Sequence, residues 1–131
     1  MLFPSITSFY AGLFAILFVA LSAWVVGGRL QDDTLFGTGD NSLTRRVRSQ
    51  GNFAEYVPFA LLLIALLEAG GGSRVLVQVL CIVLLVARLL HPVGMLAPKN
   101  SPQQFACRGG GIVATFLVIL VTGLVLLVRS A

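Results

Sequence analysis

Long stretches without charge constrain this chain more than any other feature of its sequence. The first 28 residues carry no charged side chain, and residues 9–28 alone give 20 uncharged, mostly apolar positions. At a rise of about 1.5 Å per residue, a helix of that length crosses a hydrocarbon core of roughly 30 Å. The segment lacks the positively charged start of a signal peptide and is too long for the apolar region of one. It therefore predicts a membrane-spanning helix that is retained.

Three further segments complete a predicted bundle of four membrane-spanning helices. Residues 112–128 are uncharged and end at Arg129. The apolar runs at residues 56–67 and 75–87 are too short to cross a membrane, so each helix must include the charged residues beside it. Ser73 follows three glycines and is expected to cap the third helix. The predicted fold is an all-α integral membrane protein of one domain, residues 1–131, with spans near residues 6–28, 44–68, 74–96 and 106–128.

The composition excludes several classes of protein. The 131 residues are 57% hydrophobic and 11% charged, whereas a typical soluble domain is about 25% charged. The basic residues are scattered among turns and helix ends without interleaved aromatic residues, so we expect no nucleic-acid partner. The two cysteines lack metal-ligand spacing, so we expect no metal site. The sequence also contains no nucleotide-binding loop and no nucleophile elbow.

Positive charge is distributed unevenly between the two ends of the predicted spans. With four spans, the connections around residues 29–43 and 97–105 share one side, and both termini share the other side with the turn at residues 69–74. The side of the longer connections holds Arg29, Arg45, Arg46, Arg48, Arg88, Lys99 and Arg108, and the other side holds Arg74 and Arg129. The positive-inside rule therefore predicts that the longer connections are cytoplasmic and that both termini are not.

The second predicted helix carries a polar stripe. Arg48, Asn52 and Glu55 stand at positions i, i+4 and i+7, which fall on one side of a helix with about 3.6 residues per turn. Tyr56 flanks this stripe, whereas Gln50 points roughly to the opposite side. Ionisable groups inside membrane spans indicate function because their burial is costly, although this cost is smaller near an interface.

The stripe leaves two interpretations open. Glu55 can take an ammonium group, Arg48 a carboxylate through its planar fork, and Asn52 a peptide-like group, which together describe a zwitterionic ligand. Alternatively, Arg48 and Glu55 neutralise each other or neighbouring helices and only hold the bundle together. A small four-span transporter is a third class. It is disfavoured because proton-coupled small transporters use a carboxylate in the first span, and the first span has none here.

These residues resemble the MAPEG family, the membrane-associated proteins of eicosanoid and glutathione metabolism. Residues 48–58 follow the family's Arg-x-Gln-x-Asn-x-x-Glu-Tyr-x-Pro pattern, and residues 87–95 look like its third-helix segment. Length, four spans and predicted orientation also agree, so the resemblance covers essentially the whole chain. It implies a homotrimer in membrane lipid, with glutathione bound as cosubstrate between adjacent subunits and reached from the cytoplasmic side.

The resemblance also implies roles for individual residues. The positions that match glutathione contacts in the family are Arg29, Arg48, Gln50, Asn52, Glu55 and Tyr56. In the family an arginine near the start of helix four stabilises the glutathione thiolate, and Arg108 is the only arginine there. A thiol with a pKa of about 8.5 is mostly protonated at neutral pH, so a nearby guanidinium group favours the reactive anion. Alternatively, Arg108 is a helix-start cation that faces lipid headgroups.

The third predicted helix departs from the eukaryotic members. It presents His91 and Met95, on one face with Arg88, where the eukaryotic synthases present tyrosines. His91 is a further candidate for ligand contact or proton transfer, or else an interfacial residue. The pattern resembles uncharacterised bacterial members and disfavours prostaglandin or leukotriene synthesis. We expect a bacterial inner-membrane glutathione transferase or peroxidase for lipophilic electrophiles, or alternatively a non-catalytic binding or structural protein with the same fold.

Overall fold

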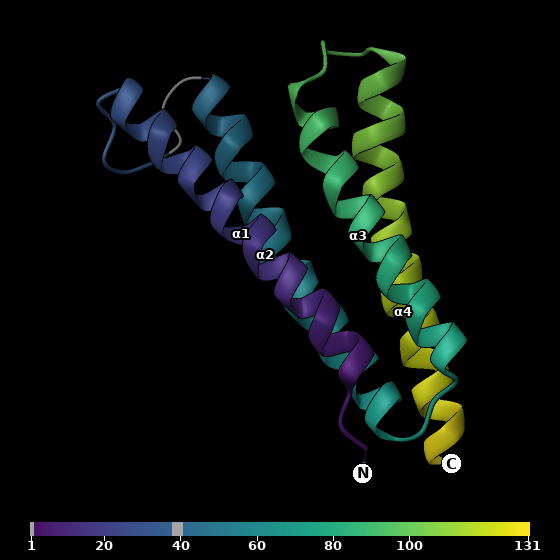
Figure 1. Ribbon diagram of the computed structural model, residues 1–131. Helices are drawn as coiled ribbons and strands as arrows, with labels where there is room; N and C mark the ends of the chain where they lie inside the picture. The colour runs from purple at the N-terminus through teal and green to yellow at the C-terminus, as the bar shows by residue number, and fades with distance from the viewer. Residues whose placement is uncertain (1, 38–40) are drawn as a thin grey trace.

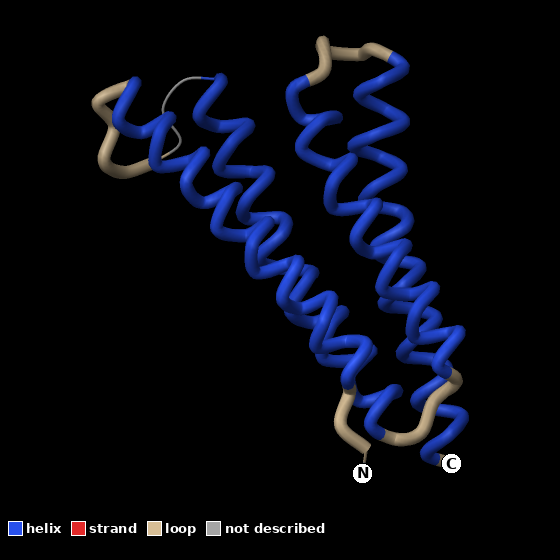
Figure 2. Tube along the Cα trace, in the orientation of Figure 1, coloured by secondary structure: helices blue, strands red, loops and turns tan. Residues whose placement is uncertain are grey.

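The described residues form four long helices and contain no strand (Figure 2). The computed structural model describes residues 2–37 and 41–131, so residues 1 and 38–40 of the predicted domain lie outside the description. The helices are α1 (Ser5–Gln31), α2 (Asn41–Ala69), α3 (Arg74–Leu96), and a fourth made of the π-helical turn η1 (Gln104–Gly109) and α4 (Gly110–Ser130). All four are long and apolar enough to cross a membrane. The predicted all-α, four-span fold is confirmed.

The two central helices do include the charged residues beside their apolar runs. α2 begins before the polar stripe and continues through it without a break. α3 likewise contains Arg88 and His91, and the Ser73 hydroxyl caps its start by accepting a hydrogen bond of 3.4 Å from the Leu76 N–H. Each of these helices is therefore long enough to span a membrane only because its polar end is also helical.

The helices form two pairs that diverge toward one end of the molecule. α1 packs mainly against α2, and α3 packs mainly against the fourth helix. Figure 1 shows the two pairs close together near the termini and apart at the end that carries the connection of residues 97–103. The buried apolar cluster, which includes Phe53, Ile64 and Leu84, joins the pairs where they are close. On α2 this cluster ends at Phe53, beside the polar stripe, so the pairs part where polar residues replace apolar ones.

Hydrogen bonds tie the chain together at the end near the termini. The Glu68 carboxylate accepts hydrogen bonds of 2.8 Å from the backbone N–H groups of Ile6 and Thr7, and one of 2.7 Å from the Thr7 hydroxyl. A carboxylate suits this position because the free N–H groups at a helix start carry partial positive charge. At the same end, Arg129 donates a hydrogen bond of 2.9 Å to the Gly70 carbonyl. This end is held by polar contacts as well as by the apolar core.

Large apolar side chains cover the outer surface of the bundle. Ile16 is 70% exposed, Val75 73% and Leu127 70%, and many other aliphatic and aromatic residues are exposed in the same way. Soluble proteins rarely expose apolar patches of this extent. The surface therefore suits lipid tails, which leaves the space between the diverging helix pairs as the distinctive polar region of the molecule.

Candidate functional site

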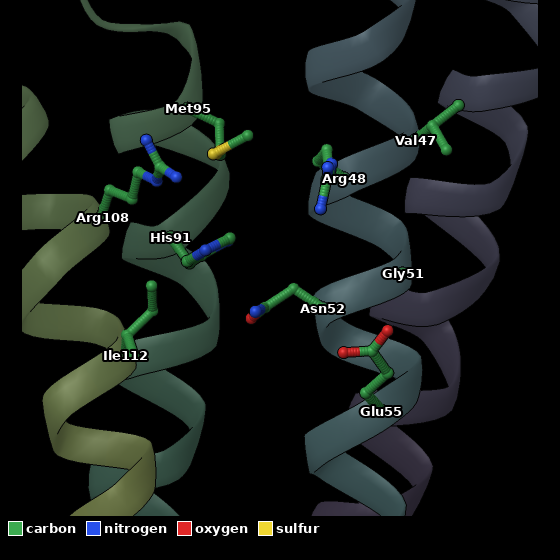
Figure 3. Close-up of a pocket in the computed structure, with 9 residues that line it drawn as sticks. All are labelled: Val47, Arg48, Gly51, Asn52, Glu55, His91, Met95, Arg108 and Ile112. Atoms are coloured by element: carbon green, nitrogen blue, oxygen red, sulfur yellow. The ribbon is translucent and has the colours of Figure 1, made fainter. Parts of the chain in front are cut away.

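A cavity of about 510 Å³ lies between α2, α3 and the start of the fourth helix. Its lining residues are Val47, Arg48, Gly51, Asn52, Glu55, His91, Met95, Arg108 and Ile112. We call it the α2–α3–α4 cavity. The volume falls in the range of roughly 300–1,000 Å³ that is usual for small-molecule sites. Figure 3 shows α2 on one side of the space, with α3 and the fourth helix on the other.

The polar stripe of α2 forms one wall of this cavity. Arg48, Asn52 and Glu55 all line it, and the Asn52 side chain reaches across toward α3 (Figure 3). Gly51 lies beside them, and no atom lies within 4 Å of a Cβ atom added at this position. The cavity therefore has free space next to Gly51. The helical spacing seen in the sequence thus brings a cation, an amide and a carboxylate into one cavity.

The charged groups that line the cavity are not used to hold the bundle together. Within the described part of the chain, Arg48, Glu55 and Arg108 make no hydrogen bond or ion pair with another side chain. Arg48 and Glu55 in particular do not pair with each other. These contacts disagree with the interpretation in which the stripe only neutralises itself or neighbouring helices, and they leave its charges available to a ligand.

His91 faces the same cavity from α3. Its side chain is only 3% exposed, and no described residue accepts or donates a hydrogen bond at its imidazole ring. Figure 3 shows the ring directed from α3 toward α2. Its ring nitrogens are not among the fully buried atoms that lack a partner, so they reach the open space of the cavity. The position of His91 therefore fits a residue that meets a ligand.

Arg88 lies behind the cavity and is the largest of the fully buried side chains. It donates hydrogen bonds to the Asn52 Oδ1 atom at 2.6 Å, the Gly111 carbonyl at 2.9 Å and the Thr115 hydroxyl at 2.5 Å. One side chain of α3 thus joins α2 to the fourth helix. The sequence pattern placed Arg88 on the face of His91 but gave it no role, because nothing local indicated its partners.

Arg108 is held at the cavity by an unusually close approach of two helices. It lies on the π-helical turn η1, where the Gly110 N–H donates to the Phe105 carbonyl five residues back. Such turns often occur at functional sites. On α3, a Cβ atom added at Gly94 would overlap the backbone nitrogen of Arg108 and lie 2.8 Å from its Cα. Gly94 is therefore needed for η1 to reach this position, and the sequence reading did not single it out.

The three glycines after Arg108 have different surroundings. A Cβ atom at Gly111 would lie 2.8 Å from the Ala87 carbonyl oxygen, whereas Gly109 and Gly110 have open space. Small residues let membrane helices pack closely, so Gly111 serves the contact between α3 and α4. Of these three glycines, close packing against α3 constrains Gly111, because no atom lies within 4 Å of a Cβ atom added at either of the others.

Three residues predicted to contact glutathione do not line this cavity. Arg29 donates hydrogen bonds to the Leu35 and Gly37 carbonyls, in the connection between α1 and α2. Gln50 is half-buried and outside the cavity lining, and the Tyr56 ring packs at 5.3 Å from the Phe116 ring. Their ligand roles remain predictions.

Metal binding has no visible basis in the described residues, 2–37 and 41–131. No three His, Cys, Asp or Glu side chains among them could hold a metal ion together. Cys81 is buried and Cys107 is half-buried, and both thiols are free.

Known proteins resemble this chain along nearly its full length. The MAPEG family profile matches residues 7–128. Two relatives named "Inner membrane protein YecN", from Escherichia coli strain K12 and from Escherichia coli O6:H1, are each 34% identical over 116 residues. The aligned part covers 88% of this chain and 85% of each relative. No solved structure matches. The matched residues include α2 and α3 in full, most of α1 and of the fourth helix, and every residue of the α2–α3–α4 cavity.

Proposed function

The chain belongs to the MAPEG family, and from this premise we propose that it binds glutathione in the α2–α3–α4 cavity and acts as a membrane-bound glutathione transferase or peroxidase on lipophilic electrophiles. The observation that carries the proposal is that Arg48, Glu55 and Arg108 face one cavity without partners in the described chain. A bundle-stabilising network would have paired them, because unpaired charge near a membrane is unfavourable.

The charges of the cavity suit glutathione. Among the described residues of the lining there are two arginines and one carboxylate, Glu55, and Arg88 lies directly behind them. The surroundings are therefore positive overall and favour a ligand with net negative charge. Glutathione carries two carboxylates and one ammonium group, so a carboxylate fits Arg48 and its ammonium group fits Glu55.

Arg108 is the group that would activate the thiol. Its guanidinium lies across the cavity from the α2 stripe (Figure 3). If Arg48 and Glu55 hold the two ends of glutathione, the thiol-bearing part between them faces η1. A cation at that point stabilises the thiolate relative to the thiol. The thiolate sulfur then forms a bond to an electrophile that arrives from the lipid and displaces a leaving group, which departs with the electron pair of the broken bond. The non-catalytic alternative keeps the same binding and lacks this step.

The native assembly that we propose is a homotrimer, as the family resemblance implies. Arg29 and Gln50 lie outside the cavity of their own subunit, so they are candidates for contact with glutathione held by an adjacent subunit. Light scattering of the detergent-solubilised protein, corrected for bound detergent, tests the assembly. A monomeric mass would remove this part of the proposal.

We further propose that the cavity opens toward the cytoplasm. The four membrane-length helices and the inner-membrane relatives support a multi-pass protein of a bacterial inner membrane. Since most cations lie at the end of the longer connections, a reporter that is active only in the cytoplasm should be silent when fused after Ala131. The same reporter inserted between Lys99 and Asn100 should be active. The reverse result would place the cavity on the other side.

Glutathione affinity should depend strongly on Arg48. Replacing Arg48 with alanine removes a charged hydrogen-bonding contact worth about 1.5–3 kcal/mol, so we expect at least a tenfold loss of affinity. Gln50→Ala should have a smaller effect because it removes no charge. Calorimetry in detergent measures both, and Arg74→Ala, the same change at the opposite end of the bundle, is the matched control. Unchanged affinity in folded Arg48→Ala protein would show that the ligand binds elsewhere.

A further inference from the structure

The polarity of the hydrogen bonds around Arg88 determines which way the Asn52 side chain faces. A guanidinium group only donates hydrogen bonds, so the atom of Asn52 that lies 2.6 Å from Arg88 Nη1 must be its oxygen. The amide nitrogen, Nδ2, is then turned away from Arg88. It makes no hydrogen bond among the described residues, although Asn52 lines the cavity. Asn52 therefore turns its oxygen toward Arg88 and its N–H donor toward the cavity.

The other contacts of Arg88 hold this arrangement in place. The Thr115 hydroxyl donates its proton to the Gly111 carbonyl at 2.8 Å, so toward Arg88 it can act only as an acceptor. The Gly111 carbonyl accepts from Arg88 as well. Both terminal nitrogens of the guanidinium are thus bound, and the side chain is only 2% exposed. Because both terminal nitrogens are bonded and protein surrounds the side chain, the planar guanidinium cannot turn away from Asn52.

We infer that Arg88 is a positioning residue that holds Asn52 with its amide N–H turned into the cavity, so that the bound peptide must present an oxygen acceptor, a carbonyl or a carboxylate, at Asn52. This inference rests on the proposed binding of glutathione. It assigns the acceptor to the part of the ligand between the groups bound by Arg48 and Glu55, because Asn52 lies between these residues on α2. Arg88 itself does not line the cavity and acts through Asn52.

Asn52→Asp separates this role from a purely structural one. The aspartate has the same shape and still accepts the hydrogen bond of Arg88, now as an ion pair with a buried cation. We expect thermal stability in detergent to be equal or higher by several degrees. The cavity, however, loses its N–H donor and gains negative charge beside an anionic ligand. Glutathione affinity should therefore fall at least about tenfold while stability does not. A residue that only held helices together would not give this opposite response.

Two further variants complete the test. Asn100→Asp makes the same chemical change on the exposed connection after α3, and neither affinity nor stability should change. Arg88→Lys adds no negative charge to the cavity, but the compact ammonium group cannot reach Asn52 and Thr115 together. Asn52 is then free to turn, so glutathione affinity should fall severalfold even though every lining residue is intact. This variant excludes simple charge repulsion as the cause of the effect in Asn52→Asp.

The outcomes distinguish this inference from the proposed function. Equal glutathione affinity in wild type and Asn52→Asp would overturn the inference and leave glutathione binding in place. A marked loss of stability in Asn52→Asp would contradict the oxygen-to-Arg88 orientation. If the wild-type protein does not bind glutathione, the proposed function fails, and the stability comparison of Asn52→Asp and Asn100→Asp alone decides the orientation of Asn52.

Discussion

Replacing Arg108 with serine should abolish the thiolate of bound glutathione while leaving most of its affinity intact. The guanidinium favours the anion over the thiol, so its loss raises the pKa of the bound thiol toward the value of a thiol in water. At neutral pH, turnover with a generic electrophile should fall about 100-fold or more, as when a preorganised group that stabilises developing charge is removed from other enzymes. The contacts from α2 remain, so glutathione should still bind.

The direction of the pH dependence follows from the same argument. Because the reaction needs the deprotonated thiol, the rate of Arg108→Ser should rise at higher pH than that of the wild type. The ultraviolet absorbance of the thiolate on adding glutathione, a pH–rate profile and a binding isotherm together make the measurement. Arg108→Lys should recover activity only in part, since an ammonium is a point charge without the planar fork.

Arg129→Ser provides the matched control, because it makes the same change at the far end of the fourth helix. It should leave the pH profile unaltered. Identical profiles for wild type and Arg108→Ser would instead assign Arg108 to lipid headgroups. Tight binding of glutathione by the wild type, with neither thiolate absorbance nor turnover, would favour the non-catalytic alternative.

Gly94→Ala should disrupt the site more than any other single-methyl addition on α3. The new Cβ atom would overlap the backbone nitrogen of Arg108, and backbone cannot turn aside as a flexible side chain can. The start of the fourth helix must therefore move away from α3. Such overpacking costs about 1–3 kcal/mol of stability or more. A displacement of about 1 Å at a reacting group commonly costs about 100-fold in rate. We expect both losses in the same variant, measured by thermal unfolding in detergent and by turnover.

Gly109→Ala is the control for this change. Gly109 is the next residue after Arg108, but no atom lies within 4 Å of its added Cβ, so the methyl group has room. Alanine is also the better helix former by about 1 kcal/mol. The Gly109→Ala protein should be at least as stable as the wild type and fully active. If Gly94→Ala behaves in the same way, close approach of α3 to η1 does not position Arg108.

Helical periodicity and apolar length were sufficient to predict the elements of this protein and one wall of its site. Two spans follow from long uncharged segments, and the other two from apolar runs that reach membrane length only with the charged residues beside them. Arg48, Asn52 and Glu55 share a face because the spacing of i, i+4 and i+7 is a property of a single helix. The capping role of Ser73 is equally local, since it involves a residue only three positions away. Each of these inferences needs information from one helix alone.

The opposite wall of the site was decided by how the helices pack against each other. Arg88 contacts Asn52, 36 positions away in the sequence, and Gly94 contacts Arg108 across two helices. Two such residues meet only if they lie at the same level along the axis of the bundle. This level depends on the crossing angles of the helices and on where small residues allow close approach, and no local sequence pattern encodes either. The sequence by itself determined which groups are charged and which face they share. Only the tertiary structure decided that both terminal nitrogens of Arg88 are bonded while Arg48, Glu55 and Arg108 remain without partners in the described chain, because partners come from other helices.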